Sequence, residues 1–440
     1  MTYTPIIGLE VHVELKTKSK MFCGCSVEYF GKEPNTHTCP VCLGLPGALP
    51  VPNRTAIEWC IMIAQALNCE INTFSKFDRK NYFYPDLSKG FQISQYDLPF
   101  GKNGSITLKS GRKIGITRVH MEEDTGKLTH QDVDGVKTSL IDFNRAGLPL
   151  VEVVTEPDFH SSEDVTEYLQ SLQQIVRYLD VSNADMEKGD MRLEPNISLQ
   201  KEGETSLPPY KVEVKNINSF RFVAKAIEFE LVRQKEILES GTIPTQETRG
   251  WSEAKNETYS QRIKEEANDY RYFPEPDIPP IIHSDEAISS ILSKVPELSE
   301  KRSGRFMSEY SLTQYDAEIL TRDRSLADYF EDTVSLGSTE NITPKQIANM
   351  IINQKIDHSS LSQAALIDKI KTENKVDTLD QAELSSIIEK VLIENERAVT
   401  DYKSGKESVI MFLVGQCMRH IGRKVDVALV KTALEQALQK

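Results

Sequence analysis

The 440-residue sequence contains no apolar run that approaches the roughly 18 residues needed to cross a membrane as a helix. The first alternating apolar segment begins at Ile6, which leaves no room for a signal or transit peptide. We therefore expect a cytoplasmic protein with no membrane-spanning segment. The formal net charge of −14 argues against a protein that coats nucleic acid in general, although a local basic patch is compatible with it.

Two catalytic signatures are also absent from the sequence. No Gly-x-x-x-x-Gly-Lys-Ser/Thr loop occurs, which excludes a P-loop kinase. No cysteine is placed as a nucleophile with a base, and no serine-rich amidase signature occurs. The chain therefore shows no means of its own for releasing ammonia from glutamine.

The seven cysteines, an odd number, do not suggest a disulfide framework in a protein expected in the cytoplasm. Four of them form two close pairs, with Cys23 and Cys25 in a Cys-x-Cys motif and Cys39 and Cys42 in a Cys-x-x-Cys motif. This spacing resembles a zinc ribbon and predicts a structural Zn²⁺ bound by all four thiolates within residues 21–45. The alternative is a loop of reduced thiols that holds no metal.

An alternating pattern at residues 6–15 is the segment around which we expect the chain to be organised. Apolar residues occupy the odd positions, whereas Glu10, His12 and Glu14 share the other face. This period of two predicts a β-strand with one buried face. Carboxylates and an imidazole at two-residue steps suit a hard cation such as Mg²⁺, although a solvated strand face has the same pattern.

The same design recurs in three later segments, which also combine apolar positions with charged ones. The charged positions are Glu152 (residues 150–154), Arg192 (residues 191–199), and Glu213 and Lys215 (residues 211–216). A carboxylate inside an apolar run, such as Glu152, is costly to bury without a cation or a hydrogen-bond donor. If these strands pair, their polar faces form one concave charged surface, as a site for Mg²⁺ and phosphates requires.

Five longer segments carry a resemblance to a known family. They are IGLEVHVEL (residues 7–15), DRKNYFYPDLSKGFQISQYD (78–97), RVHMEEDTGK (118–127), NRAGLPLVEVVTEPD (144–158) and DYRYFPEPD (269–277). In this order they resemble the B-subunit of the bacterial tRNA-dependent amidotransferase, which converts Glu-tRNA(Gln), and in many organisms Asp-tRNA(Asn), to the correct amide. The resemblance runs from about residue 3 to the C-terminus, so the chain is identified as a member of this family.

The resemblance implies an ATP-dependent amidation in two steps. The side-chain carboxylate of the misacylated amino acid attacks the γ-phosphate of ATP to give an acyl phosphate, and ammonia then displaces phosphate. ATP and Mg²⁺ are the implied cofactors, beside the structural Zn²⁺. A separate amidase (glutaminase) A-subunit would supply the ammonia, and a small C-subunit would complete a heterotrimer that acts on misacylated tRNA. Whether tRNA(Gln), tRNA(Asn) or both are substrates depends on the synthetases of the cell.

The strand pattern and the resemblance together indicate the site residues. The Mg²⁺ ligands that we expect are Glu10, His12, Glu123 and Glu152. The choice of Glu123 within the acidic triplet leaves Glu122 and Asp124 open as alternatives. The residues expected to contact ATP, phosphate or the acyl phosphate are Lys80, Arg192, Glu213 and Lys215.

One segment departs from the family pattern. Family members more often have Cys-Asp-Val or Cys-Asp-Ala where this chain has Leu193, Glu194 and Pro195. Glu194 keeps the negative charge on a longer side chain. Proline cannot donate a backbone hydrogen bond within a sheet, so Pro195 predicts a strand edge or a bulge.

We expect an α+β fold with three parts. These are a mixed, largely antiparallel-sheet cradle domain with an inserted zinc ribbon (residues 1–294), an all-α connector (295–365) and an all-α tail (366–440). Helices are predicted over residues 53–68, 162–179 and 220–241 of the cradle. By the resemblance, the tail binds tRNA, although a solvated face would carry the same basic residues. These are Lys403, Lys406, Arg419, His420, Arg423 and Lys424.

Two other functions account for part of the sequence. The first is a non-catalytic, zinc-stabilised adaptor that binds tRNA, but an adaptor for a polyanion gains nothing from strands lined with carboxylates. The second is a stand-alone ATP-dependent ligase, which the missing ammonia source disfavours.

Overall fold

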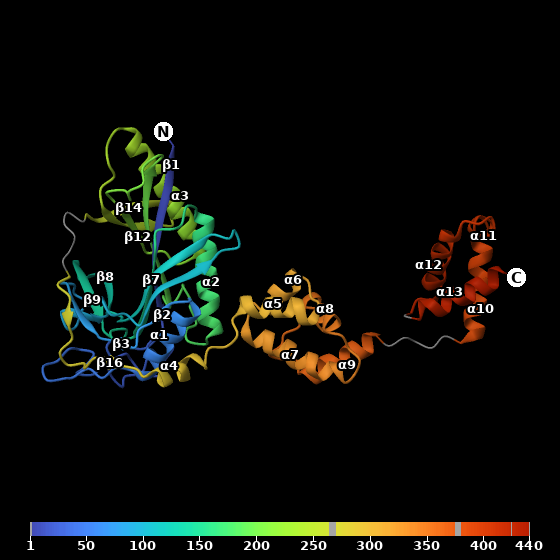
Figure 1. The fold of residues 1–440 in the computed structure, drawn as a ribbon, viewed down its shortest axis with the longest axis horizontal. Helices are drawn as coiled ribbons and strands as arrows, with labels where there is room; N and C mark the ends of the chain where they lie inside the picture. The colour runs from blue at the N-terminus through green and yellow to red at the C-terminus, as the bar shows by residue number, and fades with distance from the viewer. Residues whose placement is uncertain (1, 264–269, 375–379, 424, 440) are drawn as a thin grey trace. The chain divides into compact units, whose positions relative to one another are not determined.

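The structure, a computed structural model, describes residues 2–263, 270–374, 380–423 and 425–439 (Figure 1). The chain divides into two compact units, which are Met1–Gly304 with Thr321–Arg324, and Arg305–Leu320 with Ser325–Lys440. No helix within the described ranges is long and apolar enough to cross a membrane.

A nine-stranded sheet forms the centre of the first unit. Its strands are β1 (Tyr3–Glu14), β2 (Glu70–Ile71), β6 (Gly101–Thr107), β7 (Lys113–Glu123), β10 (Pro149–Thr155), β11 (Met191–Lys201), β12 (Val212–Lys215), β13 (Glu247–Ser252) and β14 (Glu257–Ile263). The strand order is β14-β13-β12-β11-β1-β10-β7-β6-β2, and all neighbours are antiparallel except β12 and β13. The strand predicted over residues 6–15 is therefore confirmed, and it lies in the middle of the sheet.

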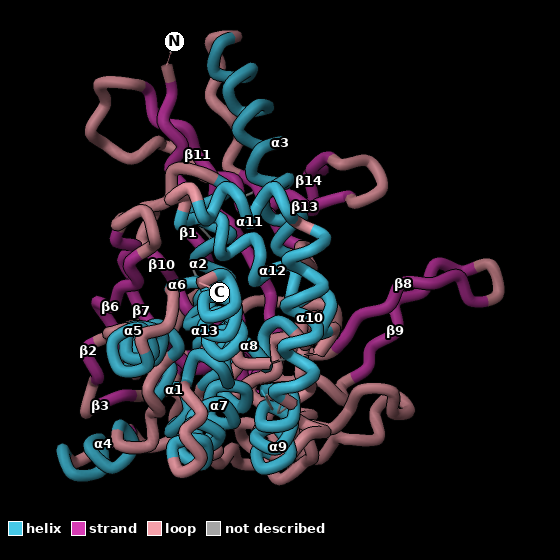
Figure 2. Tube along the Cα trace, turned by 90° about the vertical axis from the view of Figure 1, so that its right-hand side faces the viewer, coloured by secondary structure: helices cyan, strands magenta, loops and turns pink. Residues whose placement is uncertain are grey.

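Three smaller sheets complete the β structure. They are β15-β4-β5 (Phe273–Pro274, Asp78–Asn81 and Phe91–Ser94), β16-β3 (Ile281–Ile282 and Phe74–Ser75) and the hairpin β8-β9 (Lys127–Val133 and Val136–Asp142). The hairpin extends away from the large sheet, as Figure 2 shows, and most of its residues are exposed. The three-stranded sheet lies against β7 through β5.

The apolar face of β1 explains why this strand is central. Ile7, Leu9, Val11 and Val13 are completely buried. They belong to one core with the buried faces of three helices, α1 (Arg54–Ala66), α2 (Ser162–Tyr178) and α3 (Phe220–Glu239). The N-cap side chains of these helices, Asn53, Ser161 and Ser219, accept backbone N–H groups of the first turn. All three predicted helices are confirmed, as is the mixed α+β class.

Pro195 lies inside β11, directly opposite Leu9 of β1. On the other side of β11, the pairing shifts by one residue between the Leu193–Ile217 bridge and the Asn196–Glu213 pair. The shift agrees with the predicted bulge, because proline has no N–H to give to the β12 side.

Helices make up the chain after β16. They are α4 (Asp285–Leu292), α5 (Ser299–Tyr310), α6 (Gln314–Leu320), α7 (Arg324–Ser338), α8 (Pro344–Asn353), α9 (Gln363–Asn374), α10 (Gln381–Glu394), α11 (Glu396–Lys403), η1 (Glu407–Val409), α12 (Ile410–Ile421) and α13 (Val427–Leu438). One apolar core extends from Phe306 to Ile370, and another from Leu384 to Leu438. The tail boundary predicted at residue 366 falls inside α9, whose buried residues belong to the earlier core. This boundary differs from the structure because the apolar stripe of α9 does not reveal which core it joins.

Gly101 on β6 provides a stability prediction. A Cβ atom there would lie 2.5 Å from Cβ of Ala64 on α1, so Gly101→Ala should overpack the helix–sheet interface by about 1–3 kcal/mol. Calorimetry should show a lower unfolding temperature for this variant. Ser105→Ala, on the same strand but only half-buried, is the control and should leave the temperature nearly unchanged. Equal unfolding temperatures for both variants would contradict this packing.

Candidate active site and cysteine cluster

Four polar residues lie directly opposite one another on four adjacent strands. His120 on β7 faces Glu152 on β10, Glu152 faces His12 on β1, and His12 faces Arg192 on β11. Directly opposed residues of an antiparallel pair project from the same face of the sheet. Since β1 turns its apolar residues toward the core, this row lies on the polar face of the sheet.

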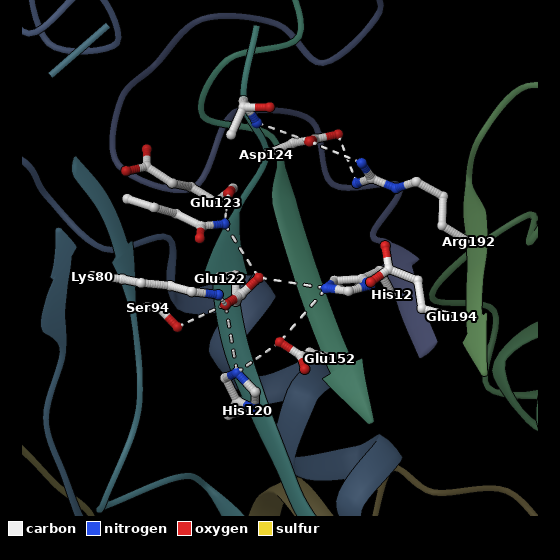
Figure 3. Close-up of polar contacts among 12 residues, drawn as sticks. His12, Lys80, Ser94, His120, Glu122, Glu123, Asp124, Glu152, Arg192 and Glu194 are labelled. Atoms are coloured by element: carbon white, nitrogen blue, oxygen red, sulfur yellow. Dashed lines mark hydrogen bonds and ion pairs between the residues drawn. The ribbon is translucent and has the colours of Figure 1, made fainter. Parts of the chain in front are cut away.

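The first candidate cation site is the group formed by His12, Glu122 and Glu152, whose nearest ligand atoms all lie within 4.8 Å of one another (Figure 3). His12 Nε2 is 3.5 Å from Oε2 of Glu152 and 3.7 Å from Oε2 of Glu122. His120 Nε2 lies 3.2 Å from Oε2 of Glu152, below the group. Two carboxylates and an imidazole form a donor set that suits a divalent cation.

The three-stranded sheet adds a cation and hydrogen-bond donors to this group. Lys80 Nζ on β4 is 3.5 Å from Oε1 of Glu122. Ser94 Oγ on β5 donates to the same oxygen at 2.9 Å, and Gln92 Nε2 donates to Oε2 at 3.2 Å. The Glu122 side chain is thereby held between the two sheets, with its carboxylate directed at His12 and His120.

Burial and mutual charge shift the pKa values within this group. Burial opposes the charged form of His12, but the neighbouring Glu152 carboxylate outweighs it and raises the pKa of His12 to about 9. Burial likewise opposes ionisation of Glu122, but Lys80 and His120 lower its pKa to about 2. The pKa of Glu152 is also well below its ordinary value, against the effect of burial, because both histidines contact it. The two carboxylates are therefore held ionised, and protons on the imidazoles balance their charge.

The second candidate cation site is the group of Glu10, Glu194 and Glu213, whose nearest ligand atoms also lie within 4.8 Å of one another. Lys215 Nζ lies 2.9 Å from Oε2 of Glu194 and 3.4 Å from Oε1 of Glu213. Burial raises the pKa of Glu10, and the charges of Glu152, Glu194 and Glu213 raise it further. Lys215, together with the charge of the nearby Lys211, does not balance three carboxylates, so this donor set also suits a divalent cation.

The structure brings most of the predicted Mg²⁺ ligands together, but it divides them between the two groups. His12 and Glu152 lie in the first group and Glu10 in the second. Glu123 belongs to neither group, because its carboxylate accepts hydrogen bonds from Lys89 Nζ at 2.7 Å and from Ile93 N at 2.9 Å. Glu122, which was left open as an alternative, occupies the position that we had assigned to Glu123.

Arg192 is close to the predicted site but is engaged by an acidic residue. Its two terminal nitrogens donate to the Asp124 carboxylate at 3.2 and 2.9 Å. Arg145 Nε lies 3.4 Å from Oδ2 of the same carboxylate. These contacts hold Asp124, directly after β7, between two arginines, of which Figure 3 shows Arg192.

Of the residues in the two groups, Glu194 was not among the predicted ligands and Glu122 was only an open alternative. His120, which lies beside the first group, was not a predicted ligand either. A signal for Glu122 was present, since it follows His120 by two residues and a strand repeats every two residues. Glu123, one residue further, projects toward the opposite side. Glu194 was noted only as a retained charge, because nothing local to β11 shows that it faces Glu10.

The four cysteines predicted to bind zinc also come together. The sulfur atoms of Cys23, Cys25, Cys39 and Cys42 all lie within 4.8 Å of one another. The backbone in residues 21–45, all of which are described, forms turns and an isolated Ser19–Ser26 bridge rather than the paired strands of a ribbon. The cluster, but not a strand-built ribbon, is therefore present.

The contacts of Cys42 fit a metal-bound thiolate. The Cys23 thiol donates a hydrogen bond that lowers the pKa of Cys42 to about 4, with further contributions from Cys39 and Lys20. The backbone N–H of Cys39 donates to Cys42 Sγ at 3.1 Å. Four convergent sulfurs with N–H donors directed at one of them suit a tetrahedral Zn²⁺.

Comparisons with known proteins give a consistent result. The family model described as the GatB/GatE catalytic domain matches residues 5–289, and the model described as the GatB domain matches residues 323–438. The chain belongs to the GatB/GatE family. The candidate site lies within the catalytic-domain match of this family.

Relatives in this family are similar to the chain over its full length. A protein of Dehalococcoides mccartyi is 45% identical and one of Thermoanaerobacter sp. is 44% identical; the matches cover 100% of this chain and 99% and 100% of the relatives. A protein of Thermomicrobium roseum is 44% identical over 100% of this chain. All three are named as the B-subunit of aspartyl/glutamyl-tRNA(Asn/Gln) amidotransferase.

The basic residues predicted in the tail lie within the match to the GatB domain, and three of them have acidic neighbours. Arg423 donates to Glu383, His420 contacts Glu394, and Lys406 donates to Asp401. Lys424 lies outside the described residues. The tail therefore shows no row of unpaired cations among these three residues.

The shifted pKa of His12 provides a test of the first group. Because Glu152 raises the pKa of His12, this contact stabilises the metal-free fold below about pH 6.5, and the contribution is lost as the pH rises through about 9. NMR titration of labelled histidines in the metal-free chain should show this pKa, and Glu152→Gln should lower it. Mg²⁺ should also lower it, since a cation competes with the proton.

Glu70→Gln, at an exposed position on β2, is the control for this titration and should leave the histidine signals unchanged. A His12 pKa that stays high in Glu152→Gln, or that does not respond to Mg²⁺, would rule out this group as a cation site.

Proposed function

We propose that this chain is the synthetic subunit of an ATP-dependent amidotransferase that converts misacylated Glu-tRNA(Gln), Asp-tRNA(Asn) or both to the correct amide. The observation that supports it most is that both candidate cation sites lie on one face of the sheet, each with a lysine beside it. The names of the relatives give the substrate class. An amidase partner and a small third subunit are the proposed companions in the complex.

The site must bring together two anions, the triphosphate of ATP and the side-chain carboxylate of the aminoacyl group. Mg²⁺ bound by His12, Glu122 and Glu152, and by Glu10, Glu194 and Glu213, would offset this charge and orient the phosphates. Lys80 and Lys215 lie at the edges of the two groups and are half-buried, so their ammonium groups can turn from a carboxylate to a phosphate oxygen. These lysines are the proposed phosphate contacts.

In the first step, an oxygen of the substrate carboxylate attacks the γ-phosphorus, and the bond from this phosphorus to the β-phosphate oxygen breaks. ADP leaves, and the substrate becomes an acyl phosphate. Lys80 would stabilise the charge on the transferred group, since it reaches the first candidate group from the facing sheet. The step needs no protein base, because the attacking carboxylate is already ionised.

In the second step, ammonia attacks the acyl carbon, phosphate leaves, and the nitrogen loses a proton to give the amide. Exclusion of water matters here, because water would hydrolyse the same intermediate. The proposed source of ammonia is the amidase partner. His120 is almost fully buried below Glu152 and serves in the proposal as a positioning residue that keeps this carboxylate oriented.

The contacts of Arg192 revise its proposed role. Its paired hydrogen bonds to Asp124 support a positioning function rather than a free phosphate contact. Zn²⁺ held by the four cysteines would be structural, since all four ligand positions are filled by protein.

The decisive test compares ATP cleavage by the co-expressed subunits with and without misacylated tRNA. Cleavage should require the aminoacyl-tRNA, and Glu152→Gln should reduce it by about 100-fold or more, because charge stabilisation in the transition state is lost. Glu10→Gln should act in the same direction. Glu70→Gln, on the edge strand β2, is the matched control and should retain activity.

The adaptor alternative predicts a different outcome. In that case the complex binds tRNA, no tRNA-dependent ATP cleavage occurs, and Glu10→Gln and Glu152→Gln behave like wild type. Cleavage that is unaffected by both variants would instead show that the active centre lies elsewhere in the complex.

A further inference from the structure

Lys20 is a completely buried lysine between the cysteine cluster and the loop that precedes β10. Its ammonium nitrogen lies 2.8 Å from the carbonyl oxygen of His37, 3.4 Å from that of Phe143 and 3.7 Å from the sulfur of Cys42. An ammonium group has three N–H donors and no acceptor. Its three donors therefore match two carbonyl oxygens and one sulfur.

No carboxylate within the described ranges forms an ion pair with Lys20. Lys80 and Lys89, by contrast, each have one, with Glu122 and Glu123 respectively. Carbonyl oxygens satisfy the hydrogen bonds of an ammonium group but carry no full negative charge. A buried cation needs an anion nearby, and the cysteine sulfur is the contact of Lys20 that can carry a negative charge.

We propose that Lys20 is the charge partner of the cysteine cluster and a positioning residue for its metal. Four thiolates around a divalent cation carry a net charge of −2, which is costly to bury. The ammonium of Lys20 offsets half of this charge and donates to the Cys42 thiolate. The inference rests on the zinc part of the proposed function, and it is independent of the amidation chemistry.

The same lysine connects the cluster to the loop that precedes β10. Lys20 donates to Phe143, His37 N donates to Oδ1 of Asn144 at 2.7 Å, and Met21 N donates to the Gly147 carbonyl at 2.7 Å. The N–H of Gly147 in turn donates to the carbonyl of Asp124, the residue that holds Arg192. A change in the charge of the cluster therefore acts on a loop bonded to the edge of the candidate active site.

The test uses the full chain co-expressed with its partner subunits. Lys20→Met keeps the length and apolar stem of the side chain and removes only the charge and the donors. Lys18→Met, two residues away at an exposed position, is the matched control. The first measurement is bound zinc and its rate of transfer to a chromogenic chelator. Lys20→Met should release zinc about 10–100-fold faster than wild type, and Lys18→Met should not.

The second measurement separates a charge effect from a loss of packing. With Co²⁺ in place of Zn²⁺, the sulfur-to-cobalt charge-transfer bands report the electron density on the thiolates. Removal of the ammonium should shift these bands in Lys20→Met, whereas Lys20→Arg, which retains the charge, should give bands close to those of wild type. If Lys20→Met does not fold, Lys20→Gln replaces it, since its amide can still donate to the carbonyls without a charge.

The outcomes distinguish this inference from the zinc site itself. A wild-type chain that binds neither zinc nor cobalt would overturn both. Bound zinc that Lys20→Met releases at the wild-type rate would overturn the role of Lys20 alone. Faster release with unchanged cobalt bands would show a packing role and would likewise refute the charge partnership.

Discussion

The concentration of carboxylates on the polar face of β1 is the constraint on which the arrangement of the first unit depends. Like charges gathered on a partly buried surface repel one another and lose hydration, so they require compensating cations. The fold supplies some of these from other elements, with Lys80 from the small sheet and Lys215 from β12. In the first group, protonated histidines supply the rest. Because protons and lysines balance these carboxylates, a divalent cation can displace the protons and a phosphate can attract the lysines.

The apolar face of the same strand stabilises this arrangement. Ile7, Leu9, Val11 and Val13 are buried against the core shared with three helices, and β1 is paired along both edges. A slip of β1 by one residue would expose this apolar set and turn Glu10 and His12 into the core. The hydrophobic effect therefore holds the charged face in register, and the two halves of the alternation depend on each other.

Much of this organisation was accessible from the sequence, because alternation and helix caps are local. The strand at residues 6–15, the helices α1, α2 and α3, and the four converging cysteines follow from spacing. The features that the sequence did not reveal are contacts between segments that lie far apart in the chain. Glu122 and Glu123 are adjacent, and their separate partners, Lys80 and Lys89, come from another sheet and its connecting loop. The pairing of Arg192 with Asp124 and the attachment of α9 to the earlier helical core likewise depend on contacts between distant segments.

The position of Glu10 and His12 on one strand has a consequence for the two cation groups. Two residues of extended chain span about 7 Å, and the backbone of β1 is hydrogen-bonded on both sides. The distance between the two groups is thus fixed by the backbone of one strand rather than by two loops that move independently. A ligand that spans the groups must conform to this spacing, and one with a longer or shorter reach finds no compensating movement of β1.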